Sequence, residues 1–335
     1  MPSISRYFRL LLPAIAYILS VMPAAAQTDA QYTQYFEVPA YYNPAAIGRQ
    51  DAIRIRAAGR LQWVGIDNAP RDIALMADMP VKIGSKRIGL GLLAQSASEG
   101  LFRNLSVGLQ AGYKFRLLKG EFTAAVQIGF ANEVFKGSEV FIPDDDDFHE
   151  GVDDAIPQND VSGNAIDLGA GVYYSHRLFW AGISGTHLNA PTITFSDDKD
   201  SPALGEGESA KNYEFQLRRT LYFMGGSNIP IKNTLFEVMP SVLVKTDFTF
   251  TRIDVTARVR YKKFLTAGVA YRHDDAVSAM LGAEFKGFFI GYSYDYPLTA
   301  ISKASSGSHE LVLGYNLKLN LSDKNKNKHK SIRIM

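Results

Sequence analysis

The sequence contains no cysteine, so the fold is built without disulfide bonds, which fits an exported chain but does not prove export. After residue 26 there is no apolar run of 18 residues, which excludes a membrane-spanning helix in that part of the chain. The net charge of +2 is too small to indicate nucleic-acid binding. Tryptophan is scarce (2 residues), whereas 17 tyrosines and 20 phenylalanines supply many aromatic side chains. Aromatic girdles at the two interfaces of a membrane β-barrel need such residues.

Catalytic and cofactor motifs are also absent. The sequence has no Gly-x-Ser-x-Gly elbow, no phosphate-binding glycine loop and no His-Glu-x-x-His pair, so no cofactor and no metal site is predicted. Two His–acid neighbours could act as a base with its orienting carboxylate, namely His273 with Asp274 and Asp275, and His309 with Glu310. Histidine beside an acid at a loop is commonplace, so we predict a non-enzymatic protein and keep an outer-membrane hydrolase as the third alternative.

The N-terminus has the pattern of a secretory signal peptide. Arg6 and Arg9 form a basic region, 10–21 is apolar, and Ala24-Ala25-Ala26 precedes a cleavage point before Gln27. The apolar run is short for a membrane anchor, the alternative for this segment. We therefore predict a signal peptide over 1–26, which leaves 309 of the 335 residues, and no cysteine for lipid attachment.

Apolar and polar residues alternate from residue 52 to residue 321. In 251–262, Val255 and Val259 point one way, while Asp254, Arg258 and Arg260 point the other, as side chains on a β-strand do. The same pattern fits a soluble sandwich with its apolar face inside or a membrane barrel with its apolar face outside. Fourteen strands are predicted, at 52–61, 72–80, 86–97, 102–116, 120–134, 164–175, 177–187, 214–228, 235–247, 251–262, 264–273, 276–286, 288–296 and 309–321.

Strand length and loop length decide between these two folds. The predicted strands are close to the ten residues that a tilted transmembrane strand needs, whereas strands of soluble sandwiches are usually nearer five or six. All long connections (62–71, 135–163, 188–213 and 297–308) fall on one side of the sheet. Short periplasmic turns and longer extracellular loops are typical of outer-membrane barrels. We predict an all-β protein with a single antiparallel transmembrane β-barrel over 52–321, a basic tail over 322–335 and both termini in the periplasm.

The loops and the turns differ in charge. The long loops 135–163 and 188–213 are acidic, which could indicate calcium, but the ligand spacing of a known calcium loop is missing, and a solvated acidic surface is the simpler interpretation. The turns are basic and fit the inner membrane interface without a ligand. Their cations are Lys82, Lys86, Lys119, Arg177, Lys232, Lys262 and Lys263.

Many ionisable side chains lie on the inward face of the predicted strands. A dozen such groups inside a barrel must be hydrated or paired, so the lumen is wet, filled by polar protein, or both. A basic anion-selective pore is one alternative, but the mixed signs favour a generic polar interior. The candidate luminal charge network consists of Arg54, Arg56, Arg258, Arg260, Asp295 and Glu310.

One segment, 27–51, does not alternate. It is dense in Tyr, Gln, Pro and Asn, and Pro39 and Pro44 favour extended or turn conformations just before them. Its aromatic side chains would be a liability in water, so they must pack inside the barrel as a plug or against a periplasmic partner. The candidate plug or docking residues are Gln31, Tyr32, Gln34, Tyr35, Phe36, Tyr41, Tyr42, Asn43 and Pro44.

This segment resembles the start of mature proteins of the PorP/SprF family, which are outer-membrane components of the type IX secretion system of Bacteroidota. The resemblance covers essentially the whole mature chain, although the acidic middle matches no motif of that family. The motifs that carry it are Gln31–Phe36, Tyr41–Ala45 with Gly48, Arg60–Trp63 with Gly65 and Pro70, Tyr294–Tyr296, and Ser308–Glu310.

The resemblance implies a barrel in the cell outer membrane that does no chemistry itself. It implies export or surface anchoring of proteins that carry a type IX C-terminal signal, including gliding adhesins. It also implies partners in the periplasmic ring and the peptidoglycan-linked parts of the machinery, besides outer-membrane lipid. Glu310 then becomes a structural residue that pairs with a luminal arginine. An outer-membrane porin or small-solute transporter is the second alternative.

Overall fold

A computed structural model describes residues 29–84, 86–140, 156–157, 159–196 and 212–319. Helices are few and short in this part of the chain. They are α2 (Pro39–Tyr42) and the 3-10 turns η1 (Pro44–Ala46), η2 (Gly137–Glu139) and η3 (Ala300–Lys303). None of the described helices has the length and apolar character needed to cross a membrane.

The rest of the described chain is β-structure. The strands are β1 (Ala52–Leu61), β2 (Arg71–Ile83), β3 (Lys86–Glu99), β4 (Phe102–Leu117), β5 (Gly120–Lys136), β6 (Asp160–Ser175), β7 (Phe179–Thr186), β8 (Thr192–Ser196), β9 (Asn212–Gln216), β10 (Thr220–Ser227), β11 (Ile229–Pro230), β12 (Phe236–Thr246), β13 (Thr251–Tyr261), β14 (Leu265–Arg272), β15 (Ala276–Phe285), β16 (Phe288–Pro297) and β17 (Ser308–Lys318).

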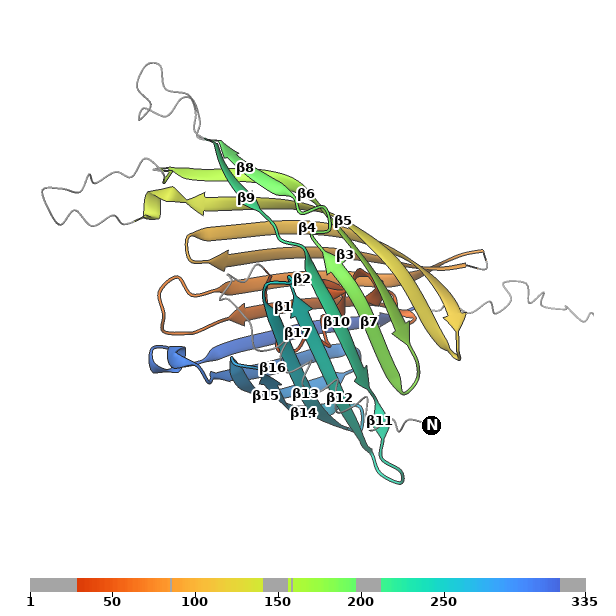
Figure 1. Ribbon diagram of the computed structural model, residues 1–335. Helices are drawn as coiled ribbons and strands as arrows, with labels where there is room; N and C mark the ends of the chain where they lie inside the picture. Colours follow the sequence, from red (N-terminus) through yellow and green to blue (C-terminus); the bar gives the residue numbers. More distant parts are fainter. Residues whose placement is uncertain (1–28, 85, 141–155, 158, 197–211, 320–335) are drawn as a thin grey trace, which may run out of the picture.

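Fourteen of these strands form a closed antiparallel barrel (Figure 1). They are β1–β7, β10 and β12–β17, each paired with its neighbour in the ring, while β11 only extends the hairpin before β12. Pairing of β10 with β12 and of β1 with β17 closes the ring, the latter in a register from Ala52–Lys318 to Leu61–His309. The predicted fourteen-strand barrel is therefore confirmed.

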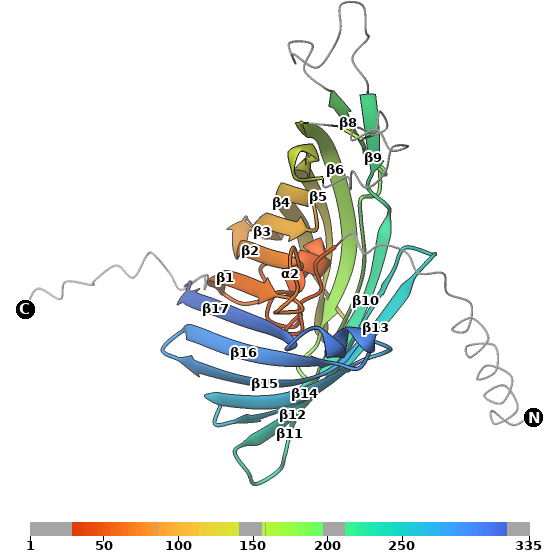
Figure 2. The ribbon, with the colours of Figure 1, turned by 90° about the vertical axis from the view of Figure 1, so that its left-hand side faces the viewer.

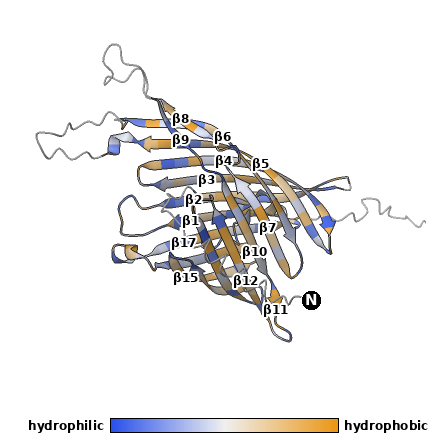
Figure 3. Cartoon of the chain, in the orientation of Figure 1, coloured by the Kyte–Doolittle hydropathy of each residue, from blue (hydrophilic) through white to orange (hydrophobic). Residues whose placement is uncertain are grey.

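The barrel is apolar outside and polar inside. Leu109 and Val269 expose 66% and 62% of their surface on the outer face, whereas Asp254 and Arg258 are buried in the lumen. Figure 3 shows the resulting alternation of hydrophobic and hydrophilic residues along the strands. This arrangement is the reverse of a soluble sandwich and matches a barrel whose outer face meets lipid.

One predicted strand is wrong in its extent. The range 214–228 contains two strands, because β9 leaves the barrel to pair with β8, and only β10 joins the ring. The β8–β9 hairpin packs against the long ends of β5 and β6 through a small apolar cluster of its own. Ile193 and Phe195 are buried there against Val161 and Leu217. This wall of the barrel therefore extends further at its long-loop end than the wall formed by β13–β16 (Figure 1).

The two ends of the barrel differ in the length of their connections. The short-turn end carries the connections 84–85, 118–119, 176–178, 228–235, 262–264 and 286–287, and the long-loop end carries all the others. The segment 29–48, called the luminal segment here, lies inside the ring between these ends. Figure 2 shows it, with α2, enclosed by the strands.

Candidate functional site: the luminal segment

The local fold of the luminal segment follows from its prolines, Asn43 and Gly48. Pro39 and Pro44 each occupy the first turn of a short helix, where the missing N–H costs nothing. The Asn43 side chain caps the second helix by accepting a hydrogen bond from the backbone N–H of Ala45 at 2.8 Å. Gly48 ends the segment at φ +57°, and a Cβ there would lie 3.0 Å from the Met79 carbonyl oxygen and 3.1 Å from Gly89 Cα. The chain can therefore turn into β1 only through glycine.

Tyrosine rings form the core of the segment. Tyr32, Tyr35, Tyr41 and Tyr42 are all buried, and Tyr32 meets Tyr41 edge to face with ring centroids 5.3 Å apart. Tyr42 meets Tyr222 of β10 at the same separation, which ties this core to the barrel wall. Edge-to-face pairs stabilise by about 0.5–1.5 kcal/mol beyond the area they bury. The aromatic residues that would be a liability in water are thus packed inside the barrel.

Thr33 and Gln34 contact charged side chains on the long-loop half of β1 and β14–β17. We call this set of contacts the latch. The backbone N–H groups of Thr33 and Gln34 donate to the Glu310 carboxylate at 2.6 and 2.8 Å. The Thr33 hydroxyl donates to Asp295 at 2.8 Å. Arg60 pairs with Asp295 at 2.7 Å and with Glu310 at 3.3 Å.

Arg272 completes the latch from β14. Its guanidinium pairs with Asp254 at 2.7 Å, with Asp275 at 3.2 Å and with Asp295 at 3.4 Å. It also donates to the Thr33 hydroxyl at 3.1 Å. Every charge of the latch is buried, and removing one partner of a buried pair typically costs about 3–5 kcal/mol. The latch therefore holds Thr33 in one place.

Asp29 anchors the start of the segment, also at the long-loop end. Its carboxylate lies 3.0 Å from Nε2 of His187, just past the end of β7, and accepts from the Tyr222 hydroxyl, while its carbonyl accepts from Lys245 at 2.8 Å. His187 Nδ1 lies 3.0 Å from Asp167. Burial alone lowers the pKa of His187, but Asp29 and Asp167 outweigh it and raise the pKa to about 10.

The same contacts also shift the pKa of Asp29. Burial raises the pKa of the Asp29 carboxyl, but His187, Lys245 and Tyr222 together hold it well below its usual value. Asp29 and His187 are therefore both charged at neutral pH, so this anchor is an ion pair as well as a hydrogen bond.

The middle of the segment is fixed mainly by neutral hydrogen bonds. Asn43 Nδ2 donates to the Val172 carbonyl at 3.0 Å, and Gln110 Nε2 donates to the Ala40 carbonyl at 2.8 Å. The Ser184 hydroxyl donates to the Tyr42 carbonyl at 2.6 Å. The bonds from Gln110 and Ser184 satisfy two backbone carbonyls of a segment that has no strand partner.

At the short-turn end, charge again holds the segment. The Gly48 N–H donates to Asp78 at 2.6 Å, and Arg54 pairs with the same carboxylate at 2.9 Å. All nine residues predicted for a plug or docking segment thus lie inside the barrel.

The six residues predicted as one charge network fall into separate groups. Asp295 and Glu310 share Arg60, whereas Arg54 pairs with Asp78. The other three make the following contacts: Arg56 with Glu37 at 3.5 Å, Arg258 with the Phe36 ring at 3.3 Å from its centroid, and Arg260 with Glu237.

Several important residues were not among those predictions. Arg272 and Asp78 follow the inward parity of their strands, so the alternation alone could have identified both. Thr33, Asp29 and His187 carry no such signal, because two lie in the non-alternating segment and the third follows a strand end.

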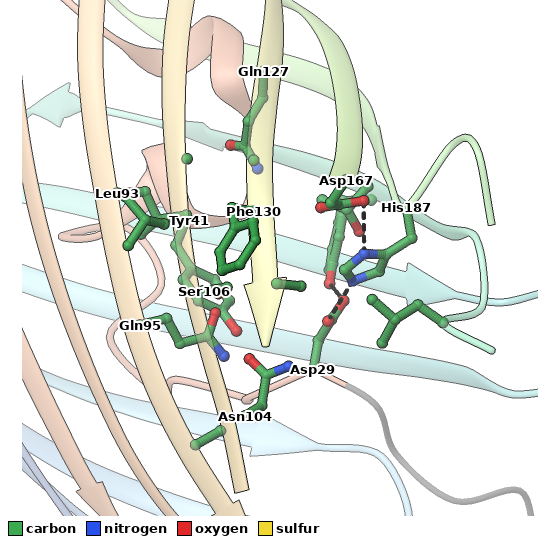
Figure 4. A pocket seen from close by; sticks show the side chains of 18 residues that line it. Asp29, Tyr41, Leu93, Gln95, Asn104, Ser106, Gln127, Phe130, Asp167 and His187 are labelled. Carbon is green, nitrogen blue, oxygen red and sulfur yellow. Dashed lines mark hydrogen bonds and ion pairs between the residues drawn. The ribbon is translucent and has the colours of Figure 1, made fainter. Parts of the chain in front are cut away.

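A small polar cavity lies between the luminal segment and the wall formed by β3–β6 (Figure 4). Its volume is about 60 Å³, room for a few water molecules. Gln95, Asn104 and Ser106 line one side and Asp29 and His187 the other. A cavity of this size between the segment and the described part of the wall is too small to be a wide channel.

The candidate catalytic pairs are not assembled into a site. His273 and Asp274 contact each other at 3.2 Å on an exposed loop tip, whereas Asp275 is engaged by Arg252 and Arg272. Glu310 serves the latch. No group of three or more His, Cys, Asp or Glu among the described residues is placed to hold a metal. Most of the acidic loop 135–163, for which calcium binding was the alternative to a solvated surface, lies outside the described residues.

The two ends of the described chain lie at opposite ends of the barrel. Lys318 pairs with Ala52 at the short-turn end, whereas Asp29 lies beside His187 and Lys245 at the long-loop end. Both termini were predicted at the short-turn end, but Asp29, the first described residue, lies at the opposite end.

Fold and site together define a β-barrel of the outer-membrane class whose lumen is filled by its own N-terminal segment. A family model for the type IX secretion system membrane protein PorP/SprF matches residues 24–315. The chain belongs to this family, and it is an outer-membrane β-barrel protein of that secretion system.

Solved structures with a similar chain path are outer-membrane barrels at low identity. A FadL homologue of Pseudomonas aeruginosa is 10% identical with a TM-score of 0.47, over 83% of this chain and 93% of that one. The translocator domain of the autotransporter NalP from Neisseria meningitidis is 13% identical with a TM-score of 0.41, over 80% and 87%. No curated protein matches the sequence. The fold assignment rests on the strand pairing itself.

Proposed function

We propose that this protein is a non-enzymatic component of the type IX secretion system that assists export or surface anchoring of proteins such as gliding adhesins. Its clients carry the type IX C-terminal signal, and its partners belong to the periplasmic ring and the peptidoglycan-linked part of the machinery. The family match supports this proposal. The residues 1–26 are a signal peptide, and the short-turn end with the tail 322–335 faces the periplasm.

The filled lumen is the observation that carries the proposal. A barrel of fourteen strands is wider than the eight-strand barrels that side chains alone can fill. Here the luminal segment occupies that space, fixed by the latch, the Asp29–His187 ion pair and the Asp78 contacts. Such a barrel is suited to serve as a rigid membrane anchor for other proteins rather than as a path for solutes.

Export is tested in cells that lack the protein. We expect loss of surface proteins with a type IX C-terminal signal, measured by mass spectrometry of material released by surface proteolysis, and recovery with the wild-type gene. A variant without Gln31–Ala45 is expected to reach the membrane as a heat-modifiable barrel but not to restore export. Normal export with the deletion variant would show that the segment is not needed for export. Normal export in cells that lack this protein would contradict the proposed function.

A matched control tests the hydrolase alternative. His273→Ala with Asp274→Ala changes two exposed side chains that hold no other described element in place. We expect full export from this variant. Loss of export by a folded H273A/D274A barrel would instead favour the hydrolase alternative.

A further inference from the structure

The six connections at the short-turn end of the barrel carry charge of one sign. All six connections there contain a lysine or arginine or are directly followed by one, and none contains an acid. Among the described residues, these cations form no ion pair, and all of them are exposed. They are Lys86, Lys119, Arg177, Lys232, Lys262, Lys263 and Lys286.

Each of these connections also contains, or directly follows, an exposed large apolar side chain. Leu118 is 81% exposed beside Lys119, and Phe285 is 61% exposed beside Lys286. The Lys286 ammonium lies 5.2 Å from the Phe285 ring centroid. The other four connections expose Ile83, Leu178, Leu235 and Phe264. An apolar group beside a cation is the arrangement that places carbon in the bilayer and charge at the headgroups.

We propose that the short-turn end is a collar that binds anionic glycerophospholipids by their phosphate groups. The collar repeats around the whole barrel, so a protein partner would cover one arc of it, whereas a lipid leaflet contacts all six units. Cations beside a membrane surface attract anionic lipid. The long-loop end differs, because its connections include Asp67, Asp247, Asp274 and Asp275. The choice of glycerophospholipid rests on the proposed orientation, with this end toward the periplasm.

The test compares purified full-length protein in nanodiscs of phosphatidylcholine with and without phosphatidylglycerol. We expect phosphatidylglycerol to raise the temperature at which the heat-modifiable band is lost. Lys119→Gln, Lys232→Gln and Lys286→Gln together remove three of the seven cations and should abolish about half of that rise. The matched control, Arg71→Gln with Arg103→Gln and Lys303→Gln, removes three exposed cations outside the collar and should keep the rise.

Salt supplies a second measurement that needs no variant. The rise for the wild type should shrink as ionic strength goes from about 0.01 M to 1 M, because the Debye length falls from about 30 to 3 Å. An equal rise in both triple variants, or a rise indifferent to salt, would overturn the collar.

A single introduced cysteine tests the orientation of the barrel separately from the binding of lipid. The chain has no native cysteine, so Lys119→Cys can be labelled on intact cells with a membrane-impermeant maleimide. We expect labelling only after the outer membrane is permeabilised. Labelling of intact cells would place the collar in the outer leaflet and overturn the glycerophospholipid assignment, while leaving the export assay unaffected.

Discussion

Thr33 shows how one hydroxyl can join three strands. It donates to Asp295 on β16 and accepts from Arg60 on β1 and Arg272 on β14, at 3.2 and 3.1 Å from the two arginines. A buried guanidinium must have its N–H groups paired, and this hydroxyl serves two of them. A short neutral side chain therefore fits at position 33, whereas a charged one would add a further charge to this buried cluster of ion pairs.

At the same scale, His187→Gln should change the pH dependence of stability. The folded pKa of about 10 lies above the ordinary 6.5, so the ion pair contributes fully below 6.5, less as pH rises, and nothing above about 10. Guanidinium unfolding in detergent at pH 6 and pH 10 should show a smaller loss of stability for the variant than for the wild type. His273→Ala, at an exposed loop, is the control. The same pH slope in H187Q would refute this assignment.

At the residue scale, alternation carries information about which side chains face the lumen. Asp295 and Glu310 were predicted to be luminal, and the pairing of Glu310 with an arginine follows from Arg60 opposite it in the closing register. The Asp29–His187 pair could not be predicted, because Asp29 lies in the non-alternating segment and no period relates the two residues.

Among elements, the luminal segment and the strand β6 fit each other through glycine. A Cβ on Gly171 would lie 2.3 Å from Asn43 Oδ1 and 2.9 Å from the Ser184 Cβ. Asn43 cannot turn away cheaply, because it caps η1 and donates to β6. Close approach of the Asn43 and Ser184 side chains to the β6 backbone, rather than a turn, is the reason for glycine at this point.

Gly171→Ala should therefore displace the middle of the luminal segment. We expect a loss of about 1–3 kcal/mol in unfolding free energy, as for overpacked cores, and faster chymotrypsin cleavage at the tyrosines and the phenylalanine within 29–48. Gly225→Ala on β10 is the matched control, because a Cβ there meets only the Trp180 carbonyl oxygen at 3.5 Å. Equal cleavage of the two variants would show that the segment does not depend on this cradle.

Element boundaries were predicted well for hairpins with tight turns and poorly for 188–228. Apolar residues keep one parity on both sides of the point where the chain leaves the β8–β9 hairpin for the barrel, with Phe215 and Leu217 before it and Leu221 after it, and only Arg219 interrupts them. Alternation reports which face a residue occupies, and it contains no record of which strand is its partner.

For the whole molecule, the filled lumen predicts that the barrel does not conduct ions at a high, steady level. Wild-type protein in planar bilayers should show no large steady conductance, whereas the variant lacking Gln31–Ala45 should conduct steadily, because its lumen retains only wall side chains. Single-channel recording checks both. Large steady currents from the wild type would favour the porin alternative over the proposed anchor. A heat-modifiable band confirms that the deletion variant is folded before recording.

The architecture was predictable at this scale because strand length, strand number and one-sided loop lengths all report the same membrane geometry. The content of the lumen was not. Tyrosines and prolines in 27–51 required burial, but they fitted a plug and a docking segment equally well, and only the contacts of 29–48 distinguish these.

The latch has a consequence for how the molecule is made. Arg60 and Glu310 face each other across the seam between the first strand and the last, and the same Glu310 accepts two N–H groups from residues 33 and 34. The segment is synthesised before any strand, so it is available when the seam forms. A barrel that closes without it leaves Glu310 with Arg60 alone and without the two N–H donors of residues 33 and 34.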